Sequence, residues 1–540
     1  MIGVVGKERG LAVAREFFEL FKTPWEPAVP GRKYRVVLAT SDELDHIDSD
    51  AFLLYGSGEY SHEHETGVKR EQLAGPLSIE WRQESFPVYG KVSAFALDRQ
   101  QTALTAQGKS IDYQWRDNGR VIWRIGYDLF DEVRYLLTKG QPAQHALTPT
   151  LELHIHFLRN LLIESRVAFV EIPPRPAGYD FICCLTHDID FYGIRRHTFD
   201  RTMAGFLYRA SIGSLIDLVR GRRSLAEAGR NWLTFCSLPL VLVGILPDFW
   251  RPFKDYAKVE DTGRSTFFLV PFRGVPGVAP DDSINAWRAT PYGISDVREE
   301  AKRASSSGSE LGIHGIDAWR DADAGREEMR QLTSLTGQKA TGIRMHWLYF
   351  DERSPVQLEK AGFEYDSTWG YNEAVGYRAG AGQAFRPLGC DRLIELPMSI
   401  MDSALFSPGR MNLAREEALL LCRQVLAYTR RFGGTLVINW HERSLAPERL
   451  WGKFYRELLE EIRQGDRAWF AKAGEAVEWF RWRRSIRFHE DPPSKAVYVE
   501  VPETCSADKR AVVRIRRPSG TEVEIRDVEF NGAKPMEVHV

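Results

Sequence analysis

The sequence predicts an α/β protein whose central part is a parallel α/β barrel or open sheet, with an α+β domain before it and a small β-rich domain after it. After residue 180, strand-like apolar runs alternate with loops and helical patterns, as in parallel α/β folds. Before that point several strand-like runs precede two helical patterns, and from about residue 486 the runs are short and β-type. We therefore expect domains at 1–170, 171–485 and 486–540.

The first domain carries strand-like runs such as RVVLA and AFLLY, and then helical patterns at 128–139 and 151–164. His154 and His156 stand two residues apart on the second helix, so their side chains point to different faces. We expect both to be structural, and no catalytic constellation appears in this domain. The Pro- and Gly-rich stretch 173–180 is typical of a linker.

Polar residues stand at or just after the ends of the central strand-like runs. Asp188 and Asp190 end the run that begins FICCL, His314 ends ELGI, Arg344 stands in TGIRMH, and His441 follows TLVIN. The carboxyl ends of parallel strands meet on one face, where such folds place their chemistry. Each residue alone has a structural explanation, such as a helix cap or a hydrogen-bonded histidine. Their joint placement favours a functional site.

Carboxylates and imidazoles in this arrangement are the oxygen and nitrogen ligands that a catalytic Zn²⁺ takes, with three from protein and one position open. Such a metal lowers the pKa of bound water and polarises a carbonyl group. The set therefore predicts hydrolysis of an amide or ester with one divalent metal ion, for which Zn²⁺ is the expected identity.

At these motifs, residues 180–482 resemble the polysaccharide deacetylase superfamily, also called the NodB-homology family or carbohydrate esterase family 4. The resemblance implies a distorted (β/α)7-type barrel and an enzyme that removes N- or O-acetyl groups from a sugar, polysaccharide or glycan precursor. The matching segments are THDID (186–190), GIHG (312–315), GIRMH (342–346) and VINWH (437–441).

The resemblance also implies a role for each matching residue. Asp188 is the catalytic base, while Asp190 and His314 are metal ligands. Arg344 orients the base, and His441 protonates the leaving group. The DxD spacing of the two aspartates is similar to that of a subgroup with some peptidoglycan deacetylases and imidase-like members.

The sequence departs from the family pattern at the metal motif. The second histidine of the family's H-x3-H motif is missing, because position 318 is Ala. His346 stands where the arginine motif has proline, and there it would supply the missing nitrogen ligand; the alternative is a substrate contact beside Trp347. Asp402 lies in a segment similar to the family's groove wall and is the candidate for tuning His441.

Aromatic residues near the motifs suit stacking on a sugar face, with core packing as the alternative. Two other functions stay open: a metal-dependent amidase or imidase acting on a small cyclic amide, and a non-catalytic carbohydrate-binding protein that has lost the metal with the second histidine. The candidates for substrate contact are Trp347, Trp369, Tyr371 and Trp440, and Trp319 lies near them in the motif region.

The composition bounds the partners and the location. A net charge of −2, with both signs spread along the chain, excludes the electrostatic pattern of a nucleic-acid binder. The six cysteines form no CxxC pair, which favours a reducing compartment. The first twenty residues lack the pattern of a signal peptide, so we expect a cytoplasmic protein. The expected partner is an acetylated sugar or glycan, and the oligomeric state stays open.

The most apolar stretch, Trp232–Leu246, is too short to span a bilayer, which takes roughly 20 residues. The preceding segment, 206–219, is also apolar and is flanked by arginines. The favoured interpretation is a buried segment. The alternative is contact with a membrane surface through residues 206–246.

Overall fold

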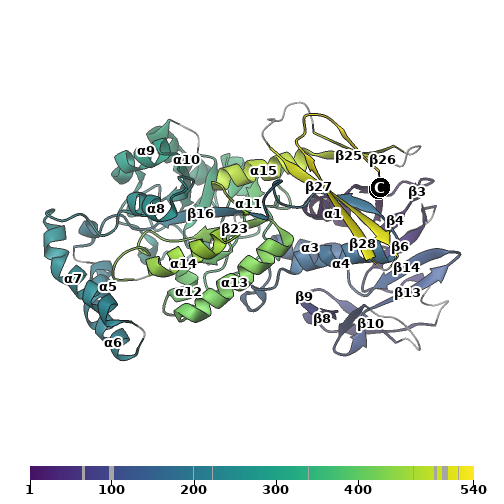
Figure 1. Cartoon of the computed structure of the whole chain (residues 1–540), viewed down its shortest axis with the longest axis horizontal. Coiled ribbons are helices and arrows are strands. Elements are labelled where there is room, and N and C mark those ends of the chain that lie inside the picture. Colours follow the sequence, from purple (N-terminus) through teal and green to yellow (C-terminus); the bar gives the residue numbers. More distant parts are fainter. Residues whose placement is uncertain are drawn as a thin grey trace.

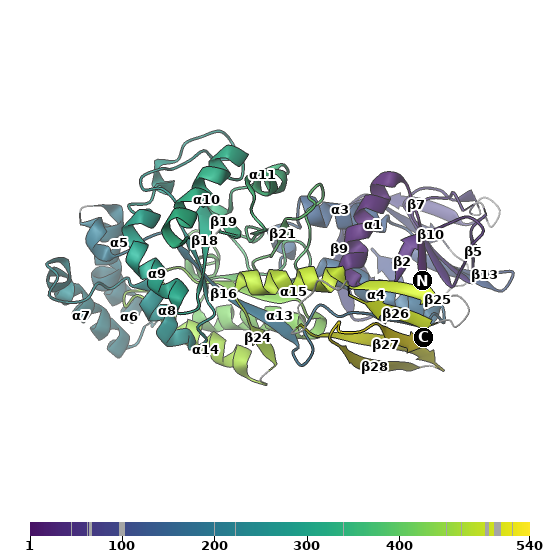
Figure 2. The same cartoon turned by 90° about the horizontal axis from the view of Figure 1, so that it is seen from above.

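The fold is known from a computed structural model. It describes the chain except residues 45, 62, 64–66, 97–102, 199, 222, 338–339, 450, 466, 492–495, 502–508, 521 and 540. The molecule is elongated, with the central barrel towards one end and the parts formed by the beginning and the end of the chain together at the other (Figures 1 and 2).

The N-terminal part combines two sheets with helices around a hydrophobic core of its own. Its elements are β1 (Ile2–Val5), α1 (Glu8–Phe21), β2 (Trp25–Pro27), β3 (Lys33–Tyr34), β4 (Val36–Ala39), β5 (Asp48–Ser49), β6 (Ala51–Tyr55), β7 (Lys69–Leu73), β8 (Leu77–Trp81), β9 (Glu84–Val88), β10 (Val92–Ala96), β11 (Leu104–Ala106), β12 (Lys109–Ser110), β13 (Asp112–Asp117), β14 (Arg120–Ile125), α3 (Leu129–Thr138), α4 (Thr150–Glu164) and β15 (Phe169–Glu171). The first sheet, β13-β14-β6-β4-β1-β2, is mostly parallel, and the second, β7-β10-β12-β11-β8-β9, is antiparallel. The predicted strands and both predicted helices are present, whereas α1 was not predicted.

The central part is the predicted α/β barrel. Its elements are β16 (Phe181–Ile189), α8 (Pro252–Glu260), β17 (Thr266–Leu269), α9 (Arg298–Ser306), β18 (Glu310–Gly315), α10 (Ala322–Thr336), β19 (Gly342–Met345), α11 (Ser354–Ala361), β20 (Tyr365–Asp366), β21 (Ile394–Glu395), β22 (Ile400–Met401), α12 (Asp402–Phe406), α13 (Arg415–Phe432), β23 (Thr435–Asn439), α14 (Trp451–Arg463), β24 (Ala468–Phe470) and α15 (Ala473–Ser485).

These strands form one curved sheet in the order β21-β20-β19-β18-β17-β16-β23-β22, with β24 beside β16. The strand pairs along this path are parallel, which confirms the predicted distorted (β/α) barrel class. All of β16 is buried, and Cys183 and Cys184 pack there as small apolar side chains. Helix α13 ends before Gly433, whose φ of 83° suits a glycine after a helix.

A helical hairpin is inserted between β16 and β17, at the end of the molecule away from both termini (Figures 1 and 2). It consists of α5 (Arg201–Tyr208), a π-helical turn (Arg209–Gly213), α6 (Ser214–Val219), α7 (Leu225–Leu242) and the turn that follows α7, up to residue 246.

The hairpin corrects the interpretation of Trp232–Leu246 as a buried segment. Leu238 and Val241 of α7 are buried, but Leu233 is 70% exposed and Val243 is 72% exposed. The buried side chains of the hairpin lie along one side of its helices, so the apolar side chains on the other sides are exposed to solvent. Among the described residues, no helix combines the length and the apolar character needed to cross a bilayer.

The end of the chain folds back onto its beginning as antiparallel β-structure. Its elements are β25 (Arg487–Asp491), β26 (Ala496–Glu500), β27 (Ala511–Ser519), β28 (Glu522–Phe530) and β29 (Met536–His539). Strand β27 pairs with β15, which precedes the linker, and β25, β26 and β29 form another small sheet. The buried Glu171 joins these parts, because Arg159 and Arg516 donate to its two carboxylate oxygens at 2.6 and 2.7 Å.

Candidate active site

The structure brings the five strand-end side chains to the same edge of the barrel. Asp188 lies near the end of β16 and Asp190 directly follows that strand. His314 in β18 is in register with Arg344 in β19, and His441 follows β23. These strands are neighbours along the parallel sheet or lie one strand apart, so residues far apart in the sequence converge at one edge.

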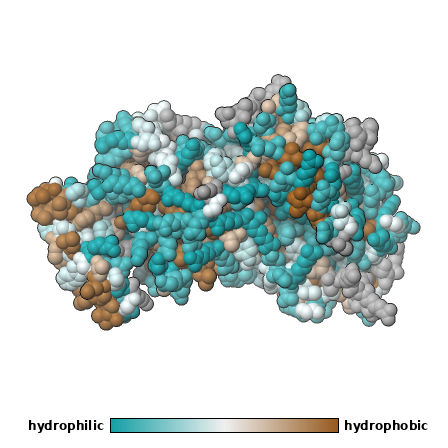
Figure 3. All heavy atoms as spheres, viewed as in Figure 1, coloured by the Kyte–Doolittle hydropathy of each residue, from teal (hydrophilic) through white to brown (hydrophobic). Residues whose placement is uncertain are grey.

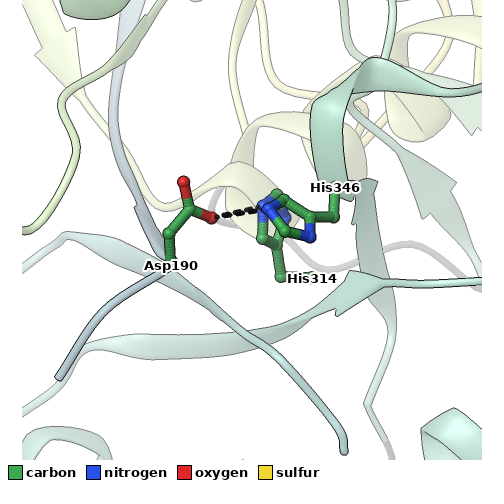
Figure 4. A group of neighbouring side chains, drawn as sticks. All are labelled: Asp190, His314 and His346. Atoms are coloured by element: carbon green, nitrogen blue, oxygen red, sulfur yellow. Dashed lines mark ion pairs between the residues drawn. The ribbon is translucent and has the colours of Figure 1, made fainter. Parts of the chain in front are cut away.

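Three side chains form a group with the composition of a metal site (Figure 4). Oδ1 of Asp190 lies 3.1 Å from Nε2 of His314 and 3.3 Å from Nε2 of His346. Their ligand atoms all lie within 4.8 Å of one another. Oδ1 of Asp190 is buried and has no hydrogen bond of good geometry among the described residues, although the imidazole nitrogens are close. Such an orphaned carboxylate oxygen between two imidazoles fits a cation.

The ring of His314 is held with its free nitrogen towards Asp190. Its Nδ1 lies 3.0 Å from the backbone carbonyl oxygen of Arg344, so Nδ1 carries the hydrogen and donates it. Nε2 is then available as a ligand, an orientation that metal-binding histidines commonly show. Burial lowers the pKa of His346 to about 3, which keeps that ring neutral, as ligation requires.

Asp188 is buried in a fixed set of donors. Arg344 donates to its Oδ1 at 2.9 Å and Asn439 donates to its Oδ2 at 2.7 Å. The guanidinium of Arg344 is itself held by Ser367 and by Thr186, at 2.9 and 2.8 Å. Burial alone would raise the pKa of Asp188, but the charge of Arg344 and the neighbouring imidazoles lower it below its ordinary value. The carboxylate therefore stays ionised.

His441 is paired with the fully buried Asp402. Nδ1 of His441 lies 2.5 Å from Oδ1 of Asp402, whose Oδ2 accepts from the backbone N–H of His441 at 2.7 Å and from Ser444. Burial works against a charged ring, but Asp402 raises the pKa of His441 to about 10. Nε2 of His441 lies 3.8 Å from Asp190. The pair thus holds a proton donor beside the possible metal position.

These groups open into a cavity of about 330 Å³. Asp188, Asp190, His314, His346 and His441 all line it, so the ionised carboxylate, the group with the composition of a metal site and the charged histidine face one space. Four arginines and an exposed tryptophan also line the cavity: Arg288, Arg410, Arg443, Arg449 and Trp287.

Trp347 is the aromatic candidate that lines the cavity. Its φ is 65°, and that of the next residue, Leu348, is 56°; both lie in the left-handed region that residues other than glycine rarely adopt. Asn372 holds this turn by donating to the carbonyl oxygen of Trp347 at 3.0 Å. A strained turn that presents an aromatic ring to a cavity marks Trp347 as a candidate for ligand contact.

The other aromatic candidates are buried away from the cavity lining. Trp440 has no exposed surface and stacks on Tyr455. Trp369 packs on Phe385, and the hydroxyl of Tyr371 donates to the carbonyl oxygen of Gln141. The cavity residues do not include these three rings, so their burial gives no support to the predicted substrate contact. Trp319 is likewise in the core.

His187 points away from the cavity, as strand alternation predicts. Its Nε2 lies 2.9 Å from Oε1 of the buried Glu260, and its ring stacks on Tyr256. Sequence reasoning missed Asn439 and Ser367, which hold the Asp188–Arg344 pair. Asn439 carried a signal, as a polar residue ending an apolar run; Ser367 follows a two-residue strand and carried almost none.

Solved structures that match this chain include proteins described as polysaccharide deacetylases, an allantoinase and a CE4 family pseudoenzyme. A protein described as a polysaccharide deacetylase from Mycobacterium smegmatis matches at 21% identity, over 58% of this chain and 95% of that one, with a TM-score of 0.36. The Puue allantoinase matches at 15% identity, over 57% and 92%, with a TM-score of 0.35. A protein described as a polysaccharide deacetylase from Pseudomonas aeruginosa PAO1 matches at 14% identity, over 57% and 94%, with a TM-score of 0.35.

No family model matches the sequence, and no curated protein does so either. The matching solved structures thus show a resemblance between the central part of this chain and polysaccharide deacetylase structures. At TM-scores this low the likeness carries no argument about function, which has to come from the site itself.

Proposed function

We propose that this protein is a metal-dependent hydrolase that removes an acetyl group from a sugar or glycan, with an amide of an acetylated amino sugar as the expected bond. The observation that carries the proposal is the joint presence in one cavity of a possible metal-ligand group, an ionised buried carboxylate and a charged histidine. Each part has a separate task in amide hydrolysis.

Asp190, His314 and His346 would hold the metal, because one carboxylate and two imidazoles match a three-ligand catalytic site with an open position. A Zn²⁺ ion there would supply an activated water nucleophile and polarise the acetyl carbonyl group. The orphaned Oδ1 of Asp190 and the neutral ring of His346 both favour a cation at this point.

Asp188 would accept the proton of the attacking water. Its carboxylate is already ionised, because Arg344 opposes the effect of burial on its pKa. Arg344 and Asn439 also fix its orientation, so little rearrangement is needed when the proton moves. We propose Arg344 as a positioning residue for this base.

His441 would donate a proton to the departing nitrogen. Leaving-group protonation by a positioned side chain contributes typically 10²- to 10⁴-fold to the rate. Asp402 holds the ring of His441 charged. His441 lies near Oδ2 of Asp190, whereas His314 lies near Oδ1 of the same carboxylate. Proton acceptor and proton donor are thus separate groups, as hydrolysis of an amide requires.

The cavity has the size for a monosaccharide unit, and Trp347 would stack on one face of the ring. This is the support for a sugar rather than an extended peptide. Because a small cyclic amide would also enter such a cavity, the test has to include both substrate classes.

The test uses protein purified with Zn²⁺ and a panel of N- and O-acetylated sugars and cyclic amides. We expect about one metal ion per chain, acetate release from an acetylated amino sugar, and loss of both metal and activity in His314→Ala. His187→Ala is the matched control, since that ring faces Glu260 outside the cavity. Full metal content in His314→Ala would contradict the ligand assignment, and ring opening of a cyclic amide without acetate release would replace the deacetylase by an amidase.

A further inference from the structure

The helical hairpin, residues 201–246, carries an unusual concentration of exposed apolar side chains. Among the described residues the chain exposes nineteen large apolar side chains, and eleven of them lie on this hairpin. They gather at the end of the molecule away from both termini, where Figure 3 shows two brown areas. They are Tyr208, Ile212, Leu215, Val219, Leu225, Trp232, Leu233, Leu240, Val243, Ile245 and Leu246.

The helical spacing puts several of these side chains on common faces. Ile212, Leu215 and Val219 stand three and four residues apart, and Leu233 and Leu240 stand seven apart. The buried seam of the hairpin is formed by other residues, so these positions are not needed to hold its helices together. Eleven exposed apolar side chains gathered at one end of the molecule indicate an interaction site.

The charge of the same segment selects the partner. Residues 201–246 contain six arginines, no lysine and two acidic residues, whereas the whole chain has a net charge of −2. Arg201, Arg220 and Arg230 are exposed among the apolar side chains. A second copy of this chain would bring the same positive charges together, which opposes self-association through this face.

An apolar face bordered by arginines is the pattern of a helix that lies in the interface of an anionic bilayer. No helix in the described part of the chain can cross a bilayer, and α7 contains Pro239, so contact along the surface is the geometry that fits. We infer that the helical hairpin docks this protein on the surface of an anionic phospholipid membrane.

Docking would place the cavity next to the lipid headgroups. Arg201 of the hairpin lies 3.7 Å from the ring centre of Trp287, an exposed residue that lines the cavity. On the other side, Arg223 donates to the carbonyl oxygen of Glu448, in the loop that follows His441. The hairpin thus borders the cavity mouth, and the binding itself does not depend on the proposed hydrolysis.

The test is co-sedimentation of the full, metal-loaded protein with vesicles. We expect binding to vesicles of equal parts phosphatidylglycerol and phosphatidylcholine and at least tenfold weaker binding to phosphatidylcholine alone. Raising the salt from about 0.1 M to about 1 M shortens the screening length from about 10 Å to about 3 Å and should also weaken binding. The double variant Leu233→Asp, Val243→Asp should lose at least tenfold.

The matched control is Leu420→Asp combined with Ile525→Asp, which changes apolar residues outside the hairpin that are 66% and 52% exposed. Both double variants should keep the wild-type Tm and acetate release from a soluble substrate, because none of the four residues lines the cavity. Wild-type protein that fails to sediment with the anionic vesicles, or an equal loss in both double variants, would overturn the inference. A dimer that dissociates only in the hairpin variant would assign the face to a second copy instead.

Discussion

Replacing Asp402 by Asn would test the His441–Asp402 pair, because the change removes the charge and keeps the shape. Burial lowers the pKa of His441, but Asp402, with smaller contributions from Asp190 and Asp188, raises it from an ordinary value of 6.5 to about 10. At about 1.4 kcal/mol per pKa unit, this difference corresponds to about 5 kcal/mol in favour of the charged ring. Without the carboxylate we expect the pKa of His441 to fall towards 6.5, with Asp190 as the remaining nearby anion.

The fall in pKa determines the pH dependence of the reaction. The proton donor is active below its pKa, which is about 10 in the metal-free protein, so the alkaline limb of kcat/KM should lie well above the ordinary value of 6.5. A ring with a pKa of about 6.5 is charged in about 1% of molecules at about pH 8.5, so kcat/KM of Asp402→Asn should be about 100-fold lower than wild type there. At about pH 5.5 the two enzymes should be nearly equal.

Two measurements check this expectation: the pH profile of kcat/KM in the metal-loaded enzyme, and an NMR titration of the His441 ring in metal-free protein. Ser444→Ala is the control, because Ser444 donates to Asp402 but leaves its charge in place; the alkaline limb should move little. Parallel pH profiles for Asp402→Asn and wild type would refute the role of His441 as the titrating acid. So would a pKa that stays near 10 in the variant.

Two further predictions concern the base and the aromatic residues. Asp188→Asn should lower kcat by 10²-fold or more while metal content stays at about one ion per chain. Asp190→Asn should lose the metal. Loss of metal in Asp188→Asn would mean that the two roles are exchanged. Trp347→Ala should raise KM with little effect on Tm, because the ring lines the cavity. Trp440→Ala removes a fully buried ring and should lower the free energy of unfolding by about 3–5 kcal/mol. A Tm loss in Trp347→Ala without a change in KM would make Trp347 a structural residue.

The convergence of the site could be predicted because it depends on a simple property of parallel sheets. Asp188, His314 and His441 stand at or after the ends of strands that run in the same direction, so they lie on the same edge of the sheet. The contact between Asp402 and His441 came only from the resemblance. This contact joins the first residue of a short helix to a residue shortly after a strand, 39 positions later in the sequence, and no local sequence pattern predicts that the two lie close together.

Other features depended on packing that the sequence does not show. The stretch Trp232–Leu246 is apolar enough for a buried segment, yet the hairpin has no second layer to cover it. Trp369 lies beside a motif in the sequence, but its ring fills the contact between the barrel and the N-terminal core. Proximity in sequence to a catalytic motif therefore does not decide whether an aromatic ring faces substrate or core.

The missing second histidine of the metal motif has a structural explanation. Glu328 of α10 accepts hydrogen bonds from the backbone N–H groups of residues 316, 317 and 318, at 3.1, 2.7 and 3.2 Å. These bonds turn the segment after β18 onto the helix and bury Ala318 completely, close to Gly325. A side chain at position 318 is thus packed in the core, and Ala318 does not line the cavity.

We propose that His346 supplies the ligand that position 318 does not, because its Nε2 lies 3.3 Å from Asp190. With His346 as the third ligand, the proposed metal site would need no side chain from position 318. We expect His346→Ala to lose most of its metal, and Ala318→His in that background to leave metal content low, because the added ring would have to fit into a filled core site. Metal content is measured in both proteins, and circular dichroism checks that both are folded. A folded double variant that regains about one ion per chain would show that position 318 can reach the metal, and that His346 is a substrate contact instead.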